Sequence, residues 1–312
     1  MNNTAMRRER RVARTALRHQ HGRTLVEIMI GMVIGLMVLG TVMRTVVSTS
    51  VSSRTQDNLG KLSEDAQIAL NLVADHVRMA GFSTPRINTT PGTASSNYTG
   101  APMRGCDGAI NDLTAPMQNI ICGAANQPNM FSVAYEADLA NTLAINGIPS
   151  DCLGQDLPPQ VSPFTGNFFV AENRFFIRNG ANGEPELACA GNGGLNGFNA
   201  PQTLIENVED MRLTYGISNT SVTEWGNTVF AGRVSNYLTA DQLDINFAAE
   251  DVMTRWNRIS AVWICMQLRT NDGVANEPTP YTDCTGNVVV PPDRRLRIAV
   301  TTTVSLRNRT LP

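Results

Sequence analysis

The sequence predicts an α+β fold, in which one long N-terminal helix is followed by a β-rich domain. Three observations carry this prediction. An apolar run from Ile28 to Met43 contains no charged residue. Apolar residues then recur at steps of three and four as far as Ala80, which is the spacing of an amphipathic helix. Several later segments alternate between apolar and polar residues, as half-buried antiparallel strands do, and this order of elements is typical of the α+β class.

Residues 1–22 read as a basic targeting leader with no fold of its own. They hold six of the 25 basic residues and one of the 27 acidic residues, which leaves residues 23–312 with a net charge of −7. A basic stretch before an apolar segment orients the N-terminus toward the cytoplasm. The acidic remainder has no basic face that would suggest nucleic-acid binding, so no nucleic-acid partner is expected.

A helix is predicted over residues 23–81. Residues 25–47 are apolar enough to span a membrane, and an ordinary secretory signal is the rival interpretation, because residues 48–53 could serve loosely as its cleavage site. The second half is amphipathic and ends at Gly81, with Pro85 just beyond. No single globular core needs so long a helix, so the first half must be buried in lipid or in other subunits. The apolar stripe of the second half consists of Leu59, Leu62, Ala66, Ala69, Val73, Val77 and Ala80.

Six cysteines follow the helix and none precedes it, which indicates up to three disulfides in an oxidising compartment. No CxxC spacing appears, and a single histidine, His76, lies beyond the leader, so no zinc site is expected. The connectivity cannot be deduced from the sequence, although pairing of sequence neighbours is favoured. The favoured pairs are Cys106 with Cys122, Cys152 with Cys189, and Cys265 with Cys284.

Residues 82–312 are predicted to form a globular, β-rich head. Residues 83–129 are rich in Pro, Gly, Asn, Ser and Thr and read as loops, as do the Gly/Asn-rich connectors 179–184, 190–200 and 271–276. The predicted strands are Phe131–Tyr135, Asn167–Val170, Arg174–Ile177, Val208–Tyr215, Ile259–Leu268 and Leu296–Leu306.

The sequence contains no pattern typical of an active site. GxSxG, HExxH, P-loop and GxGxxG motifs are all absent. We interpret His76 as a partly exposed helix residue rather than a base. Glu209 and Asp210 are adjacent in a predicted strand, where neighbours face opposite ways, so they cannot act as a carboxylate pair. The Asn/Asp/Gly loops are read as turns rather than calcium sites. No enzymatic activity, cofactor or metal is therefore expected.

Glu27 is a carboxylate at the start of the apolar run. A lone carboxylate in hydrocarbon costs on the order of several kcal/mol, so it must be protonated or paired. An ionisable residue in such a segment marks a candidate functional site. The alternative is a glutamate at the membrane edge that lipid headgroups and water solvate.

The segment GRTLVE at residues 22–27, directly before an apolar helix, resembles the prepilin motif of type IV pilins and type II secretion pseudopilins. That motif is a glycine followed usually by Phe-Thr-Leu-Ile-Glu. Residues 62–82 resemble the end of the long helix in PilW-family minor pilins. Residues 208–216 and 301–308 resemble later strands of that family. The cysteine-containing loops between these stretches match nothing that we can name.

The resemblance implies that a membrane aspartyl protease on the cytoplasmic side cleaves the chain after Gly22 and methylates the new N-terminus, Arg23. Glu27 then becomes the fifth residue, which in a filament can pair with the new amine of a neighbouring subunit. The family usually has Phe where Arg23 stands. Cleavage depends mainly on the preceding glycine, so we expect processing despite this departure.

In function, the resemblance implies a pilin-like, structural minor pilin with no active site. It would be inserted in the inner membrane as a precursor, with its head in the periplasm, and then incorporated into a pilus or its initiating tip complex at the cell surface. The implied partners are other minor pilins, the major pilin, the prepilin peptidase, the inner-membrane assembly platform and a PilY-type tip adhesin. Two alternatives stay open: a minor pseudopilin of a type II secretion system, of the GspJ kind, and a membrane-tethered periplasmic binding protein or enzyme.

Overall fold

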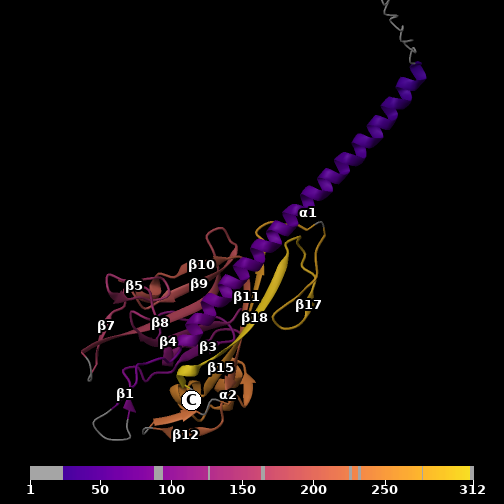
Figure 1. Ribbon diagram of the computed structural model, residues 1–312. Helices are drawn as coiled ribbons and strands as arrows, with labels where there is room; N and C mark the ends of the chain where they lie inside the picture. Colours follow the sequence, from indigo (N-terminus) through magenta and orange to yellow (C-terminus); the bar gives the residue numbers. More distant parts are fainter. Residues whose placement is uncertain are drawn as a thin grey trace, which may run out of the picture. The chain divides into compact units, whose positions relative to one another are not determined.

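The fold consists of a long N-terminal helix and two antiparallel sheets (Figure 1), so the predicted α+β class is confirmed. The chain forms two compact units, of which the first ends at Ser53 and the second begins at Arg54. Helix α1, Leu25–Met79, contributes residues to both. The computed structural model describes residues 24–87, 94–125, 127–162, 166–224, 227–230, 233–275 and 277–309.

The part of α1 in the second unit packs on the head through one apolar stripe. The stripe begins at Leu62 rather than at Leu59, whose side chain is 45% exposed because the core does not reach it. Leu70 and Ala74 are buried as well and widen the stripe. Gly81 follows the helix at φ +70°, and its N–H donates to the carbonyl of Ala134 at 2.8 Å. A positive φ at this position favours glycine, as the sequence predicts for a helix end.

The first sheet has six strands in the order β10-β9-β8-β4-β3, with β7 also paired to β8. Every pairing in it is antiparallel. β8 is the longest strand and pairs with β4 along one side and with β7 and β9 along the other. The strands are β3 (Met103–Cys106), β4 (Met130–Ala137), β7 (Pro159–Ser162), β8 (Gly166–Asn179), β9 (Pro185–Gly191) and β10 (Gln202–Glu206).

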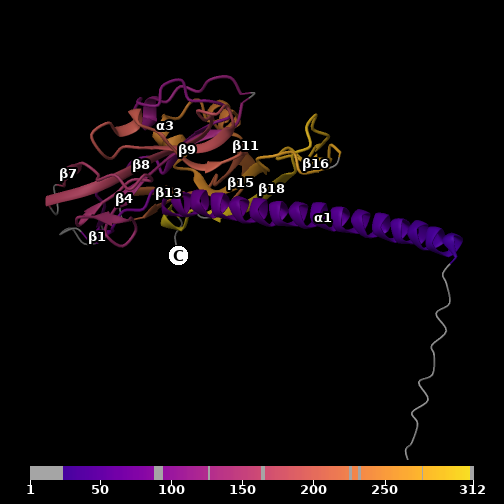
Figure 2. The same ribbon diagram turned by 90° about the horizontal axis from the view of Figure 1, so that it is seen from above.

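The second sheet has four antiparallel strands in the order β14-β11-β15-β18. Its edge strand β18 lies beside the second-unit part of α1 and runs in the same direction, as Figures 1 and 2 both show. Where both end, the side-chain amide of Asn308 donates to the carbonyl of Arg78 at 2.9 Å. The strands are β11 (Val208–Ile217), β14 (Asn236–Leu238), β15 (Ile259–Arg269) and β18 (Arg297–Ser305).

Short elements complete the head. Two short helices, α2 (Ala240–Asn246) and α3 (Val252–Trp256), lie between β14 and β15. Single 3-10 turns occur at 117–119, 197–199 and 307–309. Four two-stranded ladders are formed by β1 (Arg86–Ile87) with β2 (Ala94–Ser95), β5 (Ala144–Ile145) with β6 (Ile148–Pro149), β12 (Ser221–Glu224) with β13 (Asn227–Phe230), and β16 (Tyr281–Thr282) with β17 (Val288–Val289).

Four of the predicted strands correspond to β4, β11, β15 and β18, whereas other predictions need correction. The two strands predicted at 167–170 and 174–177 are the single strand β8. The predicted loop 83–129 contains β3, and the connector predicted at 190–200 begins inside β9. Strand β10 and helices α2 and α3 were not predicted. Prediction from sequence depends on a regular spacing of apolar residues, and polar residues or glycine interrupt that spacing in these elements.

One core joins the helix stripe to both sheets. Trp256 is fully buried in it, and the ring of Tyr215 packs edge-on against Trp256 at 5.0 Å between centroids. Asn129, just before β4, ties this part of the chain to β11. Its N–H donates to the carbonyl of Met211 at 2.8 Å, and its side-chain oxygen accepts from the N–H of Leu213 at 3.0 Å. The two sheets are therefore held by polar as well as apolar contacts.

Candidate functional site

The first unit of the described chain is an apolar helix whose side chains are not covered. From Leu25 to Val47, every large apolar side chain is between 48% and 74% exposed. The helix is long and apolar enough to cross a membrane, with a mean hydropathy of 2.3 over its most apolar stretch, none of which is buried. An apolar surface of this extent in water is unfavourable, so it must be buried in lipid or against other apolar helices.

Glu27 lies in the first turn of this helix, and Thr24 caps the same turn. The N–H of Glu27 donates to the side-chain oxygen of Thr24 at 3.3 Å and to its carbonyl at 3.0 Å. A carboxylate at this position also interacts favourably with the positive end of the helix dipole. Among the described residues, the Glu27 carboxylate has no hydrogen-bond or ion-pair partner. It is therefore available to a group from outside the described chain.

Glu27 stands out in the sequence, whereas the capping role of Thr24 was not predicted. The signal was present, because threonine followed three residues later by glutamate, just before an apolar run, has the spacing of a capping box. Gly22 and Arg23, the predicted processing residues, lie outside the described residues. Their roles therefore stay predictions.

All six cysteines of the head form disulfides, in the favoured neighbour pairing. The bonds join Cys106 to Cys122, Cys152 to Cys189, and Cys265 to Cys284. Each bond attaches a loop to a strand: β3, β9 and β15 each supply one half-cystine. Closing these loops restricts the unfolded chain, which stabilises the head. The bonds support the assignment of the head to an oxidising compartment.

His76 is a half-buried residue of α1 that faces the first sheet, in agreement with its interpretation as a partly exposed helix residue. Its Nδ1 lies 3.3 Å from the hydroxyl of Tyr135 and 3.3 Å from the side-chain amide of Asn173. Its ring lies 5.0 Å from that of Phe175. Burial lowers the pKa of His76 to about 4 although Asp75 opposes the shift, and burial raises the pKa of Tyr135 to about 12. The histidine is therefore neutral at physiological pH and packs as part of the helix–sheet contact.

An arginine–carboxylate cluster joins the β8–β9 hairpin of the first sheet to the second sheet. Glu184 accepts from both terminal nitrogens of Arg295 at 2.8 and 2.9 Å and forms an ion pair with Arg269. Arg269 also bonds Glu209 at 3.0 Å, and Arg297 bonds Glu209 at 2.7 and 2.9 Å. Hydrogen bonds from Arg295 lower the pKa of Glu184 to about 2. The negative charges of Glu184 and Glu209 are balanced by the neighbouring arginines, and both carboxylates have a structural role.

Other predicted turns and pairs have ordinary structural roles. Glu209 bonds arginines of β15 and β18, whereas its neighbour Asp210 pairs with Arg212 at 2.9 Å, so the two carboxylates do not act together. Asp283 accepts from the N–H groups of Thr285 and Asn287 at 2.9 Å each, which is turn chemistry. No group of three or more potential metal ligands exists in the described part of the chain.

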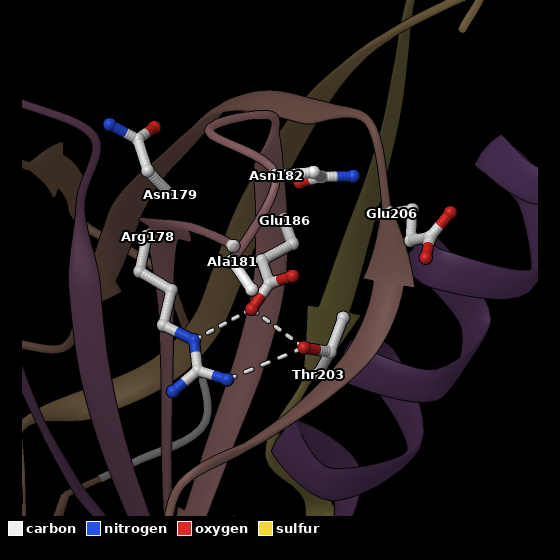
Figure 3. Close-up of a pocket in the computed structure, with 8 residues that line it drawn as sticks. Arg178, Asn179, Ala181, Asn182, Glu186, Thr203 and Glu206 are labelled. Carbon is white, nitrogen blue, oxygen red and sulfur yellow. Dashed lines mark hydrogen bonds and ion pairs between the residues drawn. The ribbon is translucent and has the colours of Figure 1, made fainter.

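An open polar hollow of about 590 Å³ lies beside the β8–β9 hairpin and β10 (Figure 3). Arg178 donates to Glu186 at 2.7 Å and to Thr203 at 3.3 Å, and Thr203 donates to Glu186 at 2.6 Å. Burial opposes ionisation of Glu186, but the hydrogen bonds from Thr203 and Arg178 outweigh it and lower the pKa of this carboxyl. Arg178, Glu186 and Thr203 thus satisfy one another, and the lowered pKa of Glu186 keeps its carboxylate ionised.

The match to one protein family agrees with the resemblance noted in the sequence. Residues 174–308 match the family model of the type IV pilus-assembly protein W, PilW. The matched region runs from within β8 to beyond β18 and includes both strand stretches of the resemblance. Among solved structures, the chain is similar to a type IV-like pilin, TTHA1219, from Thermus thermophilus, with 12% identity, a TM-score of 0.38, and coverage of 80% of this chain and 98% of that one. No curated protein matches the chain.

Proposed function

We propose that this chain, whose residues 174–308 match the PilW family model, is a structural minor pilin that is processed after Gly22 and incorporated into a type IV pilus or its initiating tip complex. One observation carries the proposal above the others. An uncovered apolar helix with a single carboxylate in its first turn continues, without a break, into the helix that packs on the PilW-type head. Such a helix can be inserted in a membrane before assembly and can later be buried among other helices.

Cleavage gives Glu27 a partner of opposite charge. Removal of residues 1–22 leaves a free amine on Arg23, four residues before Glu27. In a bundle of such helices, the amine of one subunit can reach the glutamate of the next. An unpaired charge buried in a bundle costs about 3–5 kcal/mol, so this pairing favours one axial register over the alternatives. The capping of the first turn by Thr24 keeps the Glu27 end of the helix ordered, which supports the same role.

The proposed partners follow from this assembly role. The precursor is inserted in the inner membrane with its basic N-terminus in the cytoplasm. The prepilin peptidase acts on Gly22, and the inner-membrane platform, the major pilin, other minor pilins and a PilY-type tip adhesin take part in assembly. The disulfide-bonded head lies in the periplasm first and at the cell surface once the pilus is extended.

Replacement of the predicted cleavage residue tests the proposal. We expect the Gly22→Ala protein to keep its leader and run at precursor length on a gel, and to be absent from sheared pili. Gly60→Ala is the matched control, because it adds the same methyl group to α1 where nothing lies within 4 Å of the new atom. The control should be processed and recovered normally. Mass spectrometry of the recovered protein should then find methylated Arg23 as its first residue.

Two results would overturn the proposal. If the Gly22→Ala protein still runs at mature length, the chain is not a prepilin, and a secretory signal or a plain membrane tether explains residues 1–47. If the mature protein is absent from pili but co-purifies with a type II secretion apparatus, the chain is a pseudopilin.

A further inference from the structure

Arg44 is the one basic residue in the apolar half of α1. Between Thr24 and Ser53 the sequence carries two charged residues, Glu27 and Arg44. The Arg44 side chain is exposed, and it has no hydrogen-bond or ion-pair partner within the described chain. Glu27 lies about 25 Å from Arg44 along the helix, at about 1.5 Å per residue, so the two side chains cannot meet. Nothing in the described chain therefore balances the charge of Arg44.

The apolar surface of the helix continues past Arg44. Val46 and Val47 are each 62% exposed, and the next charged residue along the chain is Arg54. The guanidinium is thus attached within an apolar segment rather than at its end. A charge in such a place marks a candidate functional site.

The hydroxyl groups on either side of Arg44 are satisfied by the helix itself. Thr41 donates to the carbonyl of Val38 at 2.8 Å, and Thr45 donates to the carbonyl of Thr41 at 3.0 Å. A hydroxyl that has a partner in its own helix needs no water, so it is compatible with hydrocarbon. The uncharged residues around Arg44 therefore suit the interior of a membrane, and the guanidinium is the exception among them.

The length of the span places Arg44 less than one helical turn inside the membrane. A hydrocarbon core of about 30 Å takes about 20 residues of helix. A span that begins after Glu27 therefore ends near Val47. The basic leader places this end of the span at the periplasmic leaflet. An arginine near the end of a span extends its apolar stem along the helix and holds its charged group at the interface.

A lipid phosphate is the anion that suits the guanidinium there. The N–H groups of a guanidinium can donate two parallel hydrogen bonds to two phosphate oxygens, a geometry that a carboxamide or a hydroxyl does not offer. The attraction is strengthened at the edge of the hydrocarbon, where the dielectric constant is lower than in water. Glu27 does not compete for Arg44, because it lies at the opposite end of the span.

We infer that the guanidinium of Arg44 binds a lipid phosphate in the periplasmic leaflet of the inner membrane, and that this contact sets the depth at which the helix is inserted. The inference rests on the proposed function, because the membrane and the orientation of the chain are taken from it. The contact belongs to the membrane-inserted form, and it is broken when the helix is drawn into a pilus.

An introduced cysteine measures the insertion depth. All six native cysteines are paired, so Ser50→Cys leaves one free thiol, beyond the expected end of the span. In cells without the assembly platform the full chain stays in the inner membrane, and a membrane-impermeant maleimide reaches this thiol from the periplasm. Adding Arg44→Leu leaves residues 28–53 uncharged over about 39 Å, so the helix can tilt or slide further into the bilayer. We expect labelling to become about tenfold slower, because hydrocarbon excludes the charged thiolate and the reagent.

Two charge variants serve as controls. Arg54→Leu removes the same charge beyond the probe and should leave the labelling of Ser50→Cys unchanged. Arg44→Lys keeps a charge on a flexible stem, and its labelling should stay within about twofold of the unchanged chain. Equal labelling with and without Arg44→Leu would overturn the inference. An effect confined to cells that assemble pili would also overturn it, because the partner would then be a carboxylate of another subunit.

Failure of the proposed function gives a different result. Leu36→Cys lies in the middle of the span and should be protected from the reagent in every variant. If it is labelled as fast as Ser50→Cys, the helix is not inserted in the membrane, and the proposed function fails together with the inference. If Leu36→Cys is protected while Arg44→Leu leaves Ser50→Cys unchanged, the inference fails alone.

Vesicles of defined composition distinguish phosphate from interfacial water as the partner. The purified full chain with Ser50→Cys is reconstituted in phosphatidylglycerol and, separately, in digalactosyl diacylglycerol, which contains no phosphate. We expect Arg44→Leu to slow labelling strongly in the first lipid and at most half as much in the second. An equal effect in both lipids would show that water holds the guanidinium, which would overturn the assignment of a phosphate partner.

Discussion

Glu27 and Thr24 share the first turn of α1, and their side chains have separable roles. Thr24 caps the helix through a hydrogen bond from the Glu27 N–H, which any residue except proline at position 27 could donate. The Glu27 carboxylate has no partner within the described residues and is free to pair with a neighbouring subunit. Thr24 therefore acts within the chain, whereas the proposed role of the Glu27 side chain is between chains.

We therefore predict opposite behaviour of the two substitutions. Glu27→Val should be cleaved normally but recovered poorly in sheared pili, because the amine of a neighbour loses its partner. Thr24→Val should lose the cap, which costs about 1 kcal/mol, yet should still enter pili. Gel mobility reports cleavage, and immunoblots of sheared pili report incorporation. Unchanged recovery of Glu27→Val would remove the pairing argument.

His76 gives the stability of the head a specific pH dependence. Its pKa is lowered to about 4 by burial, against an unperturbed value near 6.5. The unfolded chain therefore binds a proton at a higher pH than the folded chain does. The stabilising effect of neutral His76 is fully present above pH about 6.5 and is lost as the pH falls toward 4. The loss amounts to about 2 kcal/mol between pH 7 and pH 5.

Denaturant unfolding of the full chain in detergent at pH 7 and pH 5 measures this loss. The carboxyl groups of lowered pKa, such as Glu184, contribute little here, because their contribution is lost only below their unfolded pKa near 4.5. His76→Gln should have nearly equal stability at the two values of pH. If it loses as much stability as the unchanged protein does, another group is responsible.

Helices and strands were predicted best where the spacing of apolar side chains alone determines the secondary structure. The long helix, its end at Gly81 and the four strands β4, β11, β15 and β18 were predictable, because periodicity is a local property. The neighbour pairing of the cysteines was favoured but could not be deduced from the sequence. The candidate site was predictable to the same degree: Glu27 stands out in an apolar run, whereas the cap by Thr24 is visible only from its spacing.

Strand β8 shows why the rest was not predictable. Asn173 lies in the gap between the two predicted strands and Arg174 begins the second of them, and both polar side chains are fully buried. Asn173 accepts from the N–H of Cys152 at 2.8 Å, and Arg174 donates to the carbonyl of Ala115 at 2.6 Å. Those partners are 21 and 59 residues away in sequence. A buried polar side chain is stable only when it is hydrogen-bonded, and here the partners are distant in sequence. No local sequence pattern therefore predicts the burial.

The contact between β3 and β11 depends on a glycine that sequence reasoning also missed. A Cβ atom at Gly105 would lie 1.9 Å from the hydroxyl oxygen of Tyr215. That hydroxyl is buried and has no hydrogen-bond partner among the described residues. The close approach of the two strands thus requires glycine at position 105. The buried hydroxyl of Tyr215 makes no hydrogen bond there, so its desolvation lowers the stability of the folded head.

We predict that Gly105→Ala destabilises the head by about 1–3 kcal/mol, because the added methyl group overpacks the contact. Tyr215→Phe should be neutral or stabilising, since it removes an unpaired buried hydroxyl. The double variant should be less destabilised than Gly105→Ala alone, because the hydroxyl is the nearest atom to the new methyl group. Unfolding of the three proteins in urea checks this. Additive effects of the two changes would show that the residues do not interact.

At the scale of the whole head, the arginine–carboxylate cluster makes the two sheets act as one unit. Glu184 lies in a hairpin of the first sheet, whereas its partners Arg269 and Arg295 belong to β15 and to the approach to β18. Arg269 also bonds Glu209 of β11, which extends the cluster across the second sheet. Separation of the sheets would therefore break the two ion pairs of Glu184 together.

We predict that Glu184→Gln lowers the midpoint of unfolding in urea and that the effect shrinks at high salt, because the cluster is partly exposed and its charges are screened. Glu206→Gln is the matched control, since Glu206 is an exposed acid near the same hairpin with no ion pair in the described structure. In the double variant Glu184→Gln/Arg295→Gln, the loss should be smaller than the sum of the single losses, because both changes remove the same contacts. If Glu184→Gln and Glu206→Gln behave alike at low salt, the cluster does not hold the sheets together, and the core and the Asn129 contacts carry that role.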